Sequence, residues 1–192
     1  ETGLSSVDHS PLKDVNLNNC RSKIGFVPQE VFLFSDTIKN NIAFGLDQVT
    51  DTEIETAAKD AAVYYNVIDF EQKFETMLGE RGITLSGGQK QRVSIARALI
   101  KEPRLLIFDD CLSAVDTRTE EEILNNLSRI MKNRTSILIA HRISTIKNAD
   151  KIIVLDAGQI IEQGTHTQLL ALGGAYSEMY QNQLLEEENQ TN

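Results

Sequence analysis

The sequence has no excess of basic residues. It contains 19 Lys and Arg against 28 Asp and Glu, which gives a net charge of −9. Nucleic-acid-binding domains usually carry a basic face, so this balance argues against DNA or RNA as a partner. It does not argue against a nucleotide, because phosphate sites rely on backbone N–H groups, helix ends and bound cations rather than on overall charge.

Long hydrophobic runs are also missing. A membrane-spanning helix needs roughly 20 apolar residues, and the longest apolar runs, at 105–108 and 152–155, have the length of strands. No signal peptide is visible either. The sequence therefore predicts a soluble polypeptide, whose link to any membrane would come through a partner or a further segment.

Cysteine and proline are scarce. Cys20 and Cys111 fit no metal-ligand spacing and form no disulfide framework, so we expect two reduced thiols in a cytosolic protein. The three prolines and 11 glycines fall mostly at turns and mark no boundary between independent domains. We therefore expect one domain.

Short apolar runs alternate with segments of helical period, which indicates an α/β fold with a largely parallel sheet. The pattern predicts strands at 23–27, 104–108, 135–140, 151–155 and 159–162, with a turn at 156–158. It predicts helices within 51–79, from residue 86 to before residue 103, and at 117–132 and 168–172. The expected helix caps are Thr50, Asp51, Ser86 and Thr165.

One segment combines glycines with a helix start. It reads Leu85-Ser86-Gly87-Gly88-Gln89 and runs directly into residues 90–97, Lys-Gln-Arg-Val-Ser-Ile-Ala-Arg. Glycines allow a ligand to approach the backbone, and the N–H groups and dipole of a helix start favour an anion. Ser86 can cap the helix and donate to a phosphate oxygen. The three residues Ser-Gly-Gly alone predict no more than a loop-to-helix turn.

A second segment ends an apolar strand in acid. Residues 105–108, Leu-Leu-Ile-Phe, lead into Asp109 and Asp110. Open α/β sheets bind ligands at the carboxyl ends of their strands, where one carboxylate can organise Mg²⁺ and the next can orient a water. In isolation, two solvated aspartates at a strand end are an equally good interpretation.

Taken together, these segments resemble the ABC ATPases. Residues 85–97 resemble the signature motif of that family from end to end, and 105–110 resemble its Walker B motif. Residues 113–116, Ser-Ala-Val-Asp, resemble its D-loop. The resemblance implies that Leu85, Ser86, Gly87, Gly88 and Gln89 bind the nucleotide. It implies the same for the last D-loop residue, Asp116.

Two further motifs follow in the order of the family. Gln29, after Phe-Val-Pro, matches the glutamine of the Q-loop, and His141, after a strand, matches the switch histidine that contacts the γ-phosphate. The resemblance implies that Asp109 and Gln29 act on the Mg²⁺ side. It also implies that Asp110, Gln29 and His141 act in ATP hydrolysis. Alone, a glutamine after proline or a histidine after a strand would be uninformative.

The subtype resembles that of exporters. Residues 29–42 resemble half-transporter exporters, and Gly79-Glu80-Arg81-Gly82 resembles the exporter X-loop, which contacts coupling helices of the membrane domain. A polar glycine turn is the simpler alternative for these four residues. The resemblance implies ATP and Mg²⁺ as cofactors. It implies as partners an own or fused transmembrane domain and a second ABC ATPase subunit, as homodimer or heterodimer, at the cytoplasmic face of the inner membrane.

The implied fold is a partial P-loop NTPase (RecA-like) sheet with an inserted helical subdomain. We expect this subdomain at about 40–100, the remaining α/β core at 1–39 and 101–185, and an acidic tail at 186–192. No segment resembles G-x-x-x-x-G-K-[ST], the loop that cradles phosphates. We therefore expect a chain truncated after Walker A, which alone binds ATP weakly and is inactive.

Asp110 also departs from the family pattern, in which most members carry glutamate. Aspartate is one methylene shorter, and a displacement of about 1 Å can cost on the order of 100-fold in rate. The sequence therefore predicts slow hydrolysis at this site. Two alternatives to an exporter remain: a soluble ABC ATPase acting on DNA or ribosomes, and a regulatory nucleotide-binding subunit with slow turnover.

Overall fold

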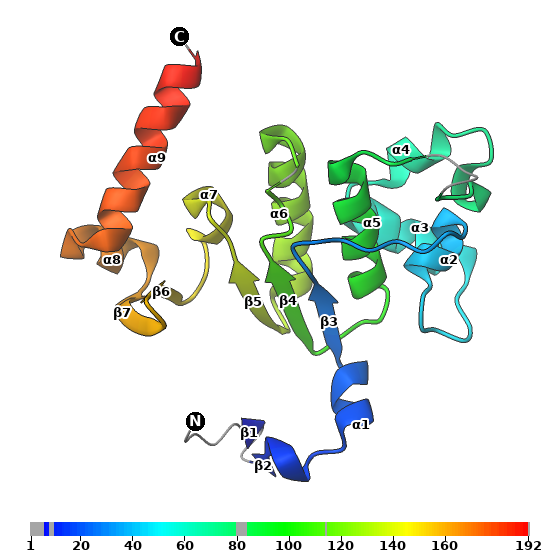
Figure 1. Cartoon of the computed structure of the whole chain (residues 1–192), viewed down its shortest axis with the longest axis horizontal. Coiled ribbons are helices and arrows are strands. Elements are labelled where there is room, and N and C mark those ends of the chain that lie inside the picture. The colour runs from blue at the N-terminus through cyan, green and yellow to red at the C-terminus, as the bar shows by residue number, and fades with distance from the viewer. Residues whose placement is uncertain (1–5, 8–9, 80–83, 114, 192) are drawn as a thin grey trace. The chain divides into compact units, whose positions relative to one another are not determined.

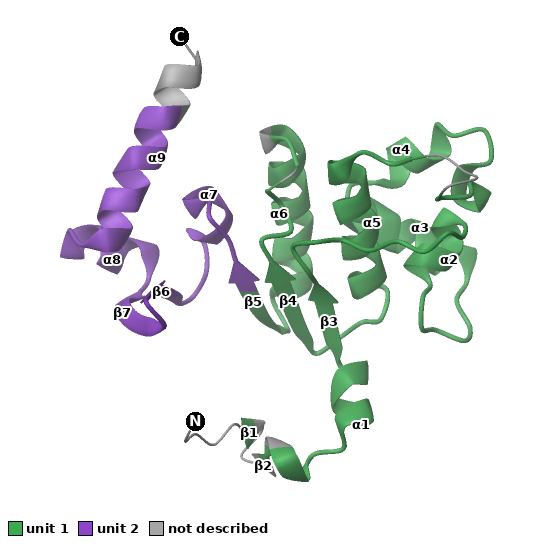
Figure 2. Cartoon of the chain, viewed as in Figure 1, with its two compact units in different colours: residues 1–137 green, residues 138–192 purple. Residues whose placement is uncertain are grey.

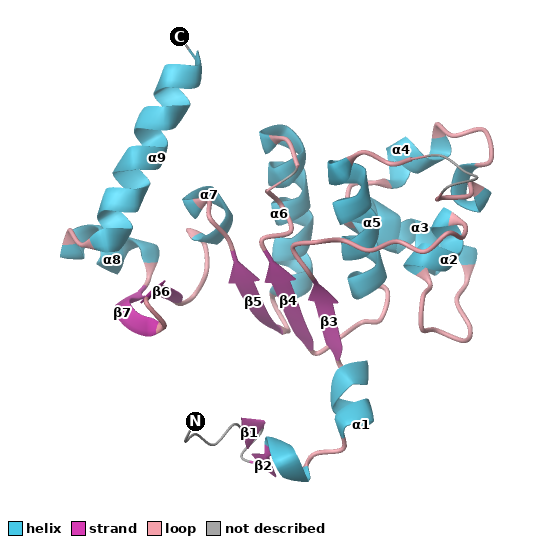
Figure 3. Cartoon of the chain, in the orientation of Figure 1, coloured by secondary structure: helices cyan, strands magenta, loops and turns pink. Residues whose placement is uncertain are grey.

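The computed structural model of the chain describes residues 6–7, 10–79, 84–113 and 115–191. Within these residues the strands form three separate sheets (Figure 3). The largest has the order β3-β4-β5, formed by Ile24–Val27, Leu105–Asp109 and Thr135–Ile139. The other two are antiparallel pairs: β1 (Ser6–Val7) with β2 (Ser10–Pro11), and β6 (Ile152–Asp156) with β7 (Gln159–Gly164).

Strands β3 and β4 run parallel, and Val27 lies opposite Phe108 at their carboxyl ends. Both residues are buried, as is Leu106 two residues before the second of them. Parallel neighbours place their carboxyl ends at the same edge of a sheet. The predicted α/β class is therefore confirmed, and the segments that follow β3 and β4 emerge side by side.

Nine α-helices and two short 3₁₀ helices lie in the described part of the chain (Figure 1). The α-helices are α1 Leu17–Ser22, α2 Ile38–Ile42, α3 Asp51–Asp60, α4 Tyr64–Ile68, α5 Gly87–Leu99, α6 Thr117–Met131, α7 Ile143–Ile146, α8 His166–Leu172 and α9 Ala175–Thr191. The 3₁₀ helices are η1 Leu12–Asp14 and η2 Lys73–Glu75.

The helices predicted within 51–79, from residue 86, at 117–132 and at 168–172 are confirmed. The short helices α1, α2 and α7 were missed in the sequence, and so was α9, the longest helix of the described residues. Thr50, Ser86 and Thr165 each cap a helix and form a capping box with the residue three positions later. The last predicted helix begins at His166 rather than at Gln168, and α9 continues through the acidic run at 186–188. Helices α1, α2 and α7 carry too few residues to show a helical period.

The chain divides into two compact units, Glu1–Ile137 and Leu138–Asn192, so that the boundary falls within β5 (Figure 2). In the first unit, α5 packs against α2, α3 and β3. Fully buried apolar side chains, among them Ile38, Ile54 and Ile95, fill the space between these elements. The division does not separate residues 40–100 from the sheet, so the inserted helical subdomain stays a prediction from the sequence.

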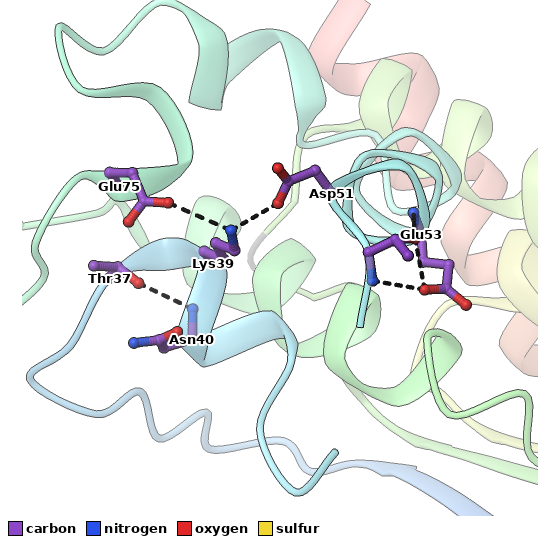
Figure 4. Close-up of polar contacts among 7 residues, drawn as sticks. Thr37, Lys39, Asn40, Asp51, Glu53 and Glu75 are labelled. Atoms are coloured by element: carbon purple, nitrogen blue, oxygen red, sulfur yellow. Dashed lines mark hydrogen bonds and ion pairs between the residues drawn. The ribbon is translucent and has the colours of Figure 1, made fainter. Parts of the chain in front are cut away.

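A surface lysine links three elements of the first unit (Figure 4). Lys39 of α2 forms ion pairs with Asp51 of α3 at 2.7 Å and with Glu75 of η2 at 3.6 Å. The bond to Asp51 raises the pKa of the Lys39 ammonium group. Both carboxylates are largely exposed, so these pairs orient the elements and add little stability.

The second unit has its own small core. Ile143, Ile152, Leu169 and Tyr176 are buried together, and they come from α7, β6, α8 and α9. The predicted turn between β6 and β7 is confirmed, with positive φ at its second and third residues, Ala157 and Gly158. In the described part of the chain, none of the helices has both the length and the apolar composition that a membrane crossing requires.

Candidate functional site

The first feature of the site is the edge where β3 and β4 end. Gln29 follows β3, Asp109 is the last residue of β4, and Asp110 comes next. The side-chain amide Nε2 of Gln29 donates to Oδ2 of Asp110 at 3.2 Å, although 81 residues separate the two. Asp110 is 9% exposed. The structure therefore brings together two of the three residues that the resemblance assigns to hydrolysis.

The backbone turns sharply at Asp110. Its φ is +42°, in the left-handed region that aspartate enters more readily than most residues with a side chain. The carbonyl oxygen of Asp110 accepts the hydroxyl of Ser113 at 2.9 Å, which stabilises the turn. Asp109 is therefore still part of the strand, whereas Asp110 lies in the turn that follows it.

The residue after these acids is a buried thiol. Burial raises the pKa of Cys111 to about 12, and the neighbouring aspartates act in the same direction. At pH 8 we therefore expect iodoacetamide to alkylate Cys20, which is partly exposed, at least about 100-fold faster than Cys111. Mass spectrometry of peptides over a time course measures this ratio. Equal rates at the two thiols would contradict the burial that the structure gives Cys111.

The second feature is the turn at Ser86, which begins α5. Its hydroxyl oxygen accepts the N–H of Gln89 at 3.3 Å, and Oε1 of Gln89 accepts the N–H of Ser86 at 2.9 Å. Ser86 and Gly87 are exposed, whereas the side chain of Leu85 is 4% exposed. A glycine-opened helix start therefore faces solvent, and Leu85 can offer a ligand only its backbone.

Arg92 fastens this helix start to the neighbouring helices. Its guanidinium donates to the carbonyl oxygens of Gly88 at 3.2 Å and Ala62 at 2.6 Å, and to Oδ1 of Asn66 at 2.8 Å. Burial lowers the pKa of the guanidinium, while the charge of Asp116 opposes that change. Arg92 was missed in the sequence because its partners outside α5, Ala62 and Asn66, lie 30 and 26 positions away, where no local pattern points to them.

Asp116 is the N-cap residue of α6. Its side chain accepts the N–H of Thr119 at 3.0 Å and so caps the helix. That hydrogen bond lowers the pKa of the Asp116 carboxyl group. The assigned contact with nucleotide stays a prediction. The D-loop residue Ala114, and Glu80, Arg81 and Gly82 of the X-loop, lie outside the described residues.

His141 belongs to the second unit, two residues after the end of β5. Its backbone carbonyl accepts Nε2 of Gln183 at 2.6 Å, and Oε1 of the same side chain accepts the N–H of Ile143 at 2.8 Å. Gln183 lies on α9, so the sequence reading gave no reason to connect it with His141.

The donor set suits Mg²⁺ and phosphate. Magnesium prefers oxygen ligands and is usually held by one or two carboxylates together with waters and substrate phosphates. Asp109 and Asp110 provide such oxygens at the strand edge, and α5 begins at Gly87, where the first N–H groups of a helix have no acceptor within the helix. Among the described residues, no group of three or more His, Cys, Asp or Glu could hold a metal by itself. Two adjacent carboxylates at the strand edge fit a cation that arrives with a phosphate ligand.

Comparisons with known proteins agree with these features. A family model described as ABC transporter matches residues 1–113. The chain is 46% identical over 184 residues to an ATM1-type heavy metal exporter of Novosphingobium aromaticivorans, covering 96% of this chain and 30% of that protein. It is 47% identical over 180 residues to an ATP-dependent lipid A-core flippase of Psychrobacter cryohalolentis, covering 93% of this chain and 30% of that protein.

A solved structure of an ABC exporter is also similar to this chain. The structure of a bacterial Atm1-family ABC exporter with ATP bound matches with a TM-score of 0.88 and 46% identity, over 92% of this chain and 31% of the other. The chain thus spans about a third of the length of these relatives. With the signature turn and the acidic strand edge in place, the match of more than half of the chain shows that it belongs to the ABC transporter family.

Proposed function

We propose that this chain is the ATP-binding and ATP-hydrolysing domain of an ABC exporter. The observation that carries the proposal is the exposed, glycine-opened start of α5 at Ser86, in a chain whose β4 strand ends at Asp109 and is followed directly by Asp110. ABC ATPase domains bind ATP, and the similar Atm1-family exporter has ATP bound. The resemblance of residues 29–42 to exporters agrees with the names of both relatives.

Each residue has a part in this proposal. Asp109 would hold Mg²⁺, which when bound neutralises phosphate charge. Asp110 would orient the attacking water, with Gln29 held beside it by the 3.2 Å hydrogen bond. His141 would contact the terminal phosphate. The N–H groups at Gly87 and Gly88 would bind the terminal phosphate of a nucleotide held on a second ATPase subunit.

An aromatic surface supports a membrane-domain partner. Phe32 is 67% exposed and packs edge-on against Phe34, which stacks on Phe44. Beside it lies a cavity of about 270 Å³, lined by Val31, Phe32, Leu33, Phe34, Leu78, Gly79, Thr84, Leu85 and Lys90. An exposed aromatic surface next to a hollow is typical of a docking site. We assign it to the transmembrane domain, because it directly follows Gln29, and the Q-loop that this segment resembles contacts the membrane domain in the ABC family.

Purification of the complete transporter tests the proposal. In detergent and in lipid vesicles, we expect Mg-ATP hydrolysis that His141→Ala reduces strongly. A purified protein that does not hydrolyse ATP would contradict the enzymatic part. A protein that hydrolyses ATP but carries no membrane-spanning region would contradict the exporter part.

The length of the Asp110 side chain gives a separate prediction. Asp110→Glu extends the carboxylate toward the water position, so we expect ATP turnover to rise several-fold. Steady-state phosphate release measures this, with Asp47→Glu in an exposed loop as the matched control that leaves turnover unchanged. An unchanged rate in Asp110→Glu would remove the idea that this site is slow because its acid is short. The positive φ at this position favours aspartate and would then be the better explanation.

A further inference from the structure

The inner face of helix α9 changes character along its length. Tyr176 is 1% exposed and lies in the core of the second unit, and Tyr180, one turn later, packs against the same core. Residues spaced by three or four positions share one face of a helix. Gln183 is the next residue of that face, so a carboxamide stands where an aromatic or aliphatic side chain would continue the packing.

This carboxamide makes two hydrogen bonds to one short backbone segment. Its Nε2 donates to the carbonyl oxygen of His141 at 2.6 Å, and its Oε1 accepts the N–H of Ile143 at 2.8 Å. The donor and acceptor sit on one planar group, so both bonds form together only when the segment has one orientation. The backbone is thereby fixed on both sides of Arg142.

The start of α7 explains why a distant side chain is needed. Helix α7 begins at Ile143, and its N-cap residue Arg142 makes no side-chain capping bond. The first N–H groups of a helix have no partner within the helix. Gln183 supplies a partner for the N–H of Ile143 and ties the same segment to α9 through the carbonyl of His141.

We propose that Gln183 is a positioning residue for His141. Its carboxamide sets the backbone from which the imidazole projects, and so holds the histidine ready for the terminal phosphate. The inference rests on the proposed function, in which His141 contacts that phosphate. Loss of the carboxamide would free the backbone at both bonded points while the aromatic packing of α9 through Tyr176 and Tyr180 remains.

The first test needs no activity. The chain has three histidines, so a ¹H–¹³C spectrum of the imidazole groups shows three signals. In Gln183→Ala we expect the His141 signal to shift or split, while the signal of His166, which contacts Tyr176 at 2.7 Å, stays in place. An unmoved His141 signal would overturn the proposal. So would an equal shift of the His166 signal, because Gln183 would then hold the whole helix α9.

The second test uses the complete transporter. We expect Gln183→Ala to lower kcat about 10-fold and to change KM for ATP by less than about twofold, because a displaced catalytic group slows the chemical step. Gln183→Glu keeps the acceptor but loses the donor to the carbonyl of His141, so it should fall with Gln183→Ala. Gln181→Ala, at an exposed position of the same helix, is the matched control and should leave kcat unchanged.

A double variant separates positioning from packing. In a His141→Ala background, Gln183→Ala should have no further effect on kcat, because both substitutions then remove the same contribution. An equal further loss in that background would overturn the proposal. A His141→Ala variant with normal kcat would instead contradict the proposed role of His141, and the imidazole spectra would still decide whether Gln183 positions it.

Discussion

Gly87→Asp is expected to lower the ATP turnover of the transporter by on the order of 100-fold or more, without destabilising the domain. Gly87 is the first residue of α5 and is exposed. A carboxylate there repels a phosphate at close range by a few kcal/mol at the effective dielectric constant of a protein surface, roughly 4 kcal/mol at 4 Å. The same carboxylate favours the helix itself by about 0.3–1 kcal/mol, because it lies at the positive end of the helix dipole.

The substitution therefore separates fold from function. Thermal unfolding should show an unchanged or slightly raised Tm, and phosphate release should show the loss. Gly87→Asn is the matched control, since it adds a side chain of the same size without the charge and should retain much more turnover. An equal loss in both variants would indicate crowding rather than repulsion. Normal turnover in Gly87→Asp would contradict a phosphate site at this turn.

Asn41→Ala is expected to lower the free energy of unfolding of the chain by about 3 kcal/mol. Asn41 is fully buried, and its Oδ1 accepts the N–H of Phe34 at 2.8 Å and Nη2 of Arg97 at 2.9 Å. Its Nδ2 donates to the carbonyl oxygens of Phe34 at 3.0 Å and Thr37 at 2.9 Å. Alanine would remove the acceptor of the Phe34 N–H and of Nη2 of Arg97, whose pKa burial already lowers. The carbonyl oxygens of Phe34 and Thr37 would keep the backbone N–H groups of Asp36 and of residue 41.

Urea unfolding measures the change as a lower midpoint at an unchanged slope. Asn40→Ala is the matched control, because Asn40 is an exposed neighbour whose side chain donates to Oδ1 of Asp36 at 2.8 Å. We expect it to cost less than about 1 kcal/mol, since the helix propensity of alanine offsets part of the lost bond. Equal effects of the two substitutions would contradict the claim that the buried hydrogen bonds of the Asn41 side chain stabilise the fold.

The sequence predicted best the elements whose signals are local. Helix α5 has a capping serine, a glutamine three residues later and a helical run of apolar residues, and its first residue was predicted to within one position. Its end was predicted before residue 103, whereas the helix ends at Leu99. Strand β4 is a continuous apolar run ending in acid, and its length and position were also predicted. Such segments can be predicted from the local sequence because the residue propensities, the hydrophobic pattern and the capping residue all favour the same secondary structure.

Helices α2 and α7 could not be predicted because their stabilising contacts are distant. Helix α2 has five residues, and Arg97 of α5 donates to both the side chain and the carbonyl oxygen of Asn41 within it. Helix α7 has four residues, and the side chain that bonds its first N–H lies 40 positions later at Gln183. The residues near α2 and α7 in the sequence give no indication that Arg97 and Gln183 stabilise these helices.

The candidate site divides in the same way. The resemblance pointed to Gln29 and Asp110, and the parallel register of β3 and β4 explains why they meet. Only the structure revealed the residues that hold parts of the site by hydrogen bonds. Arg92 bonds the helix start at the signature turn, and Gln183 bonds the backbone of His141. A motif indicates the groups that react, whereas the residues that hold them depend on the tertiary fold.

Amide hydrogen exchange at the start of α5 tests the central claim most directly. With Mg-ATP bound to the complete transporter, the N–H groups of residues 87–90 should exchange at least about tenfold more slowly than without nucleotide. The start of α3 at residues 51–54 has the same kind of capping box at Thr50 and should not change. Unchanged exchange at 87–90 while the transporter binds and hydrolyses ATP would contradict the claim that this turn grips the nucleotide.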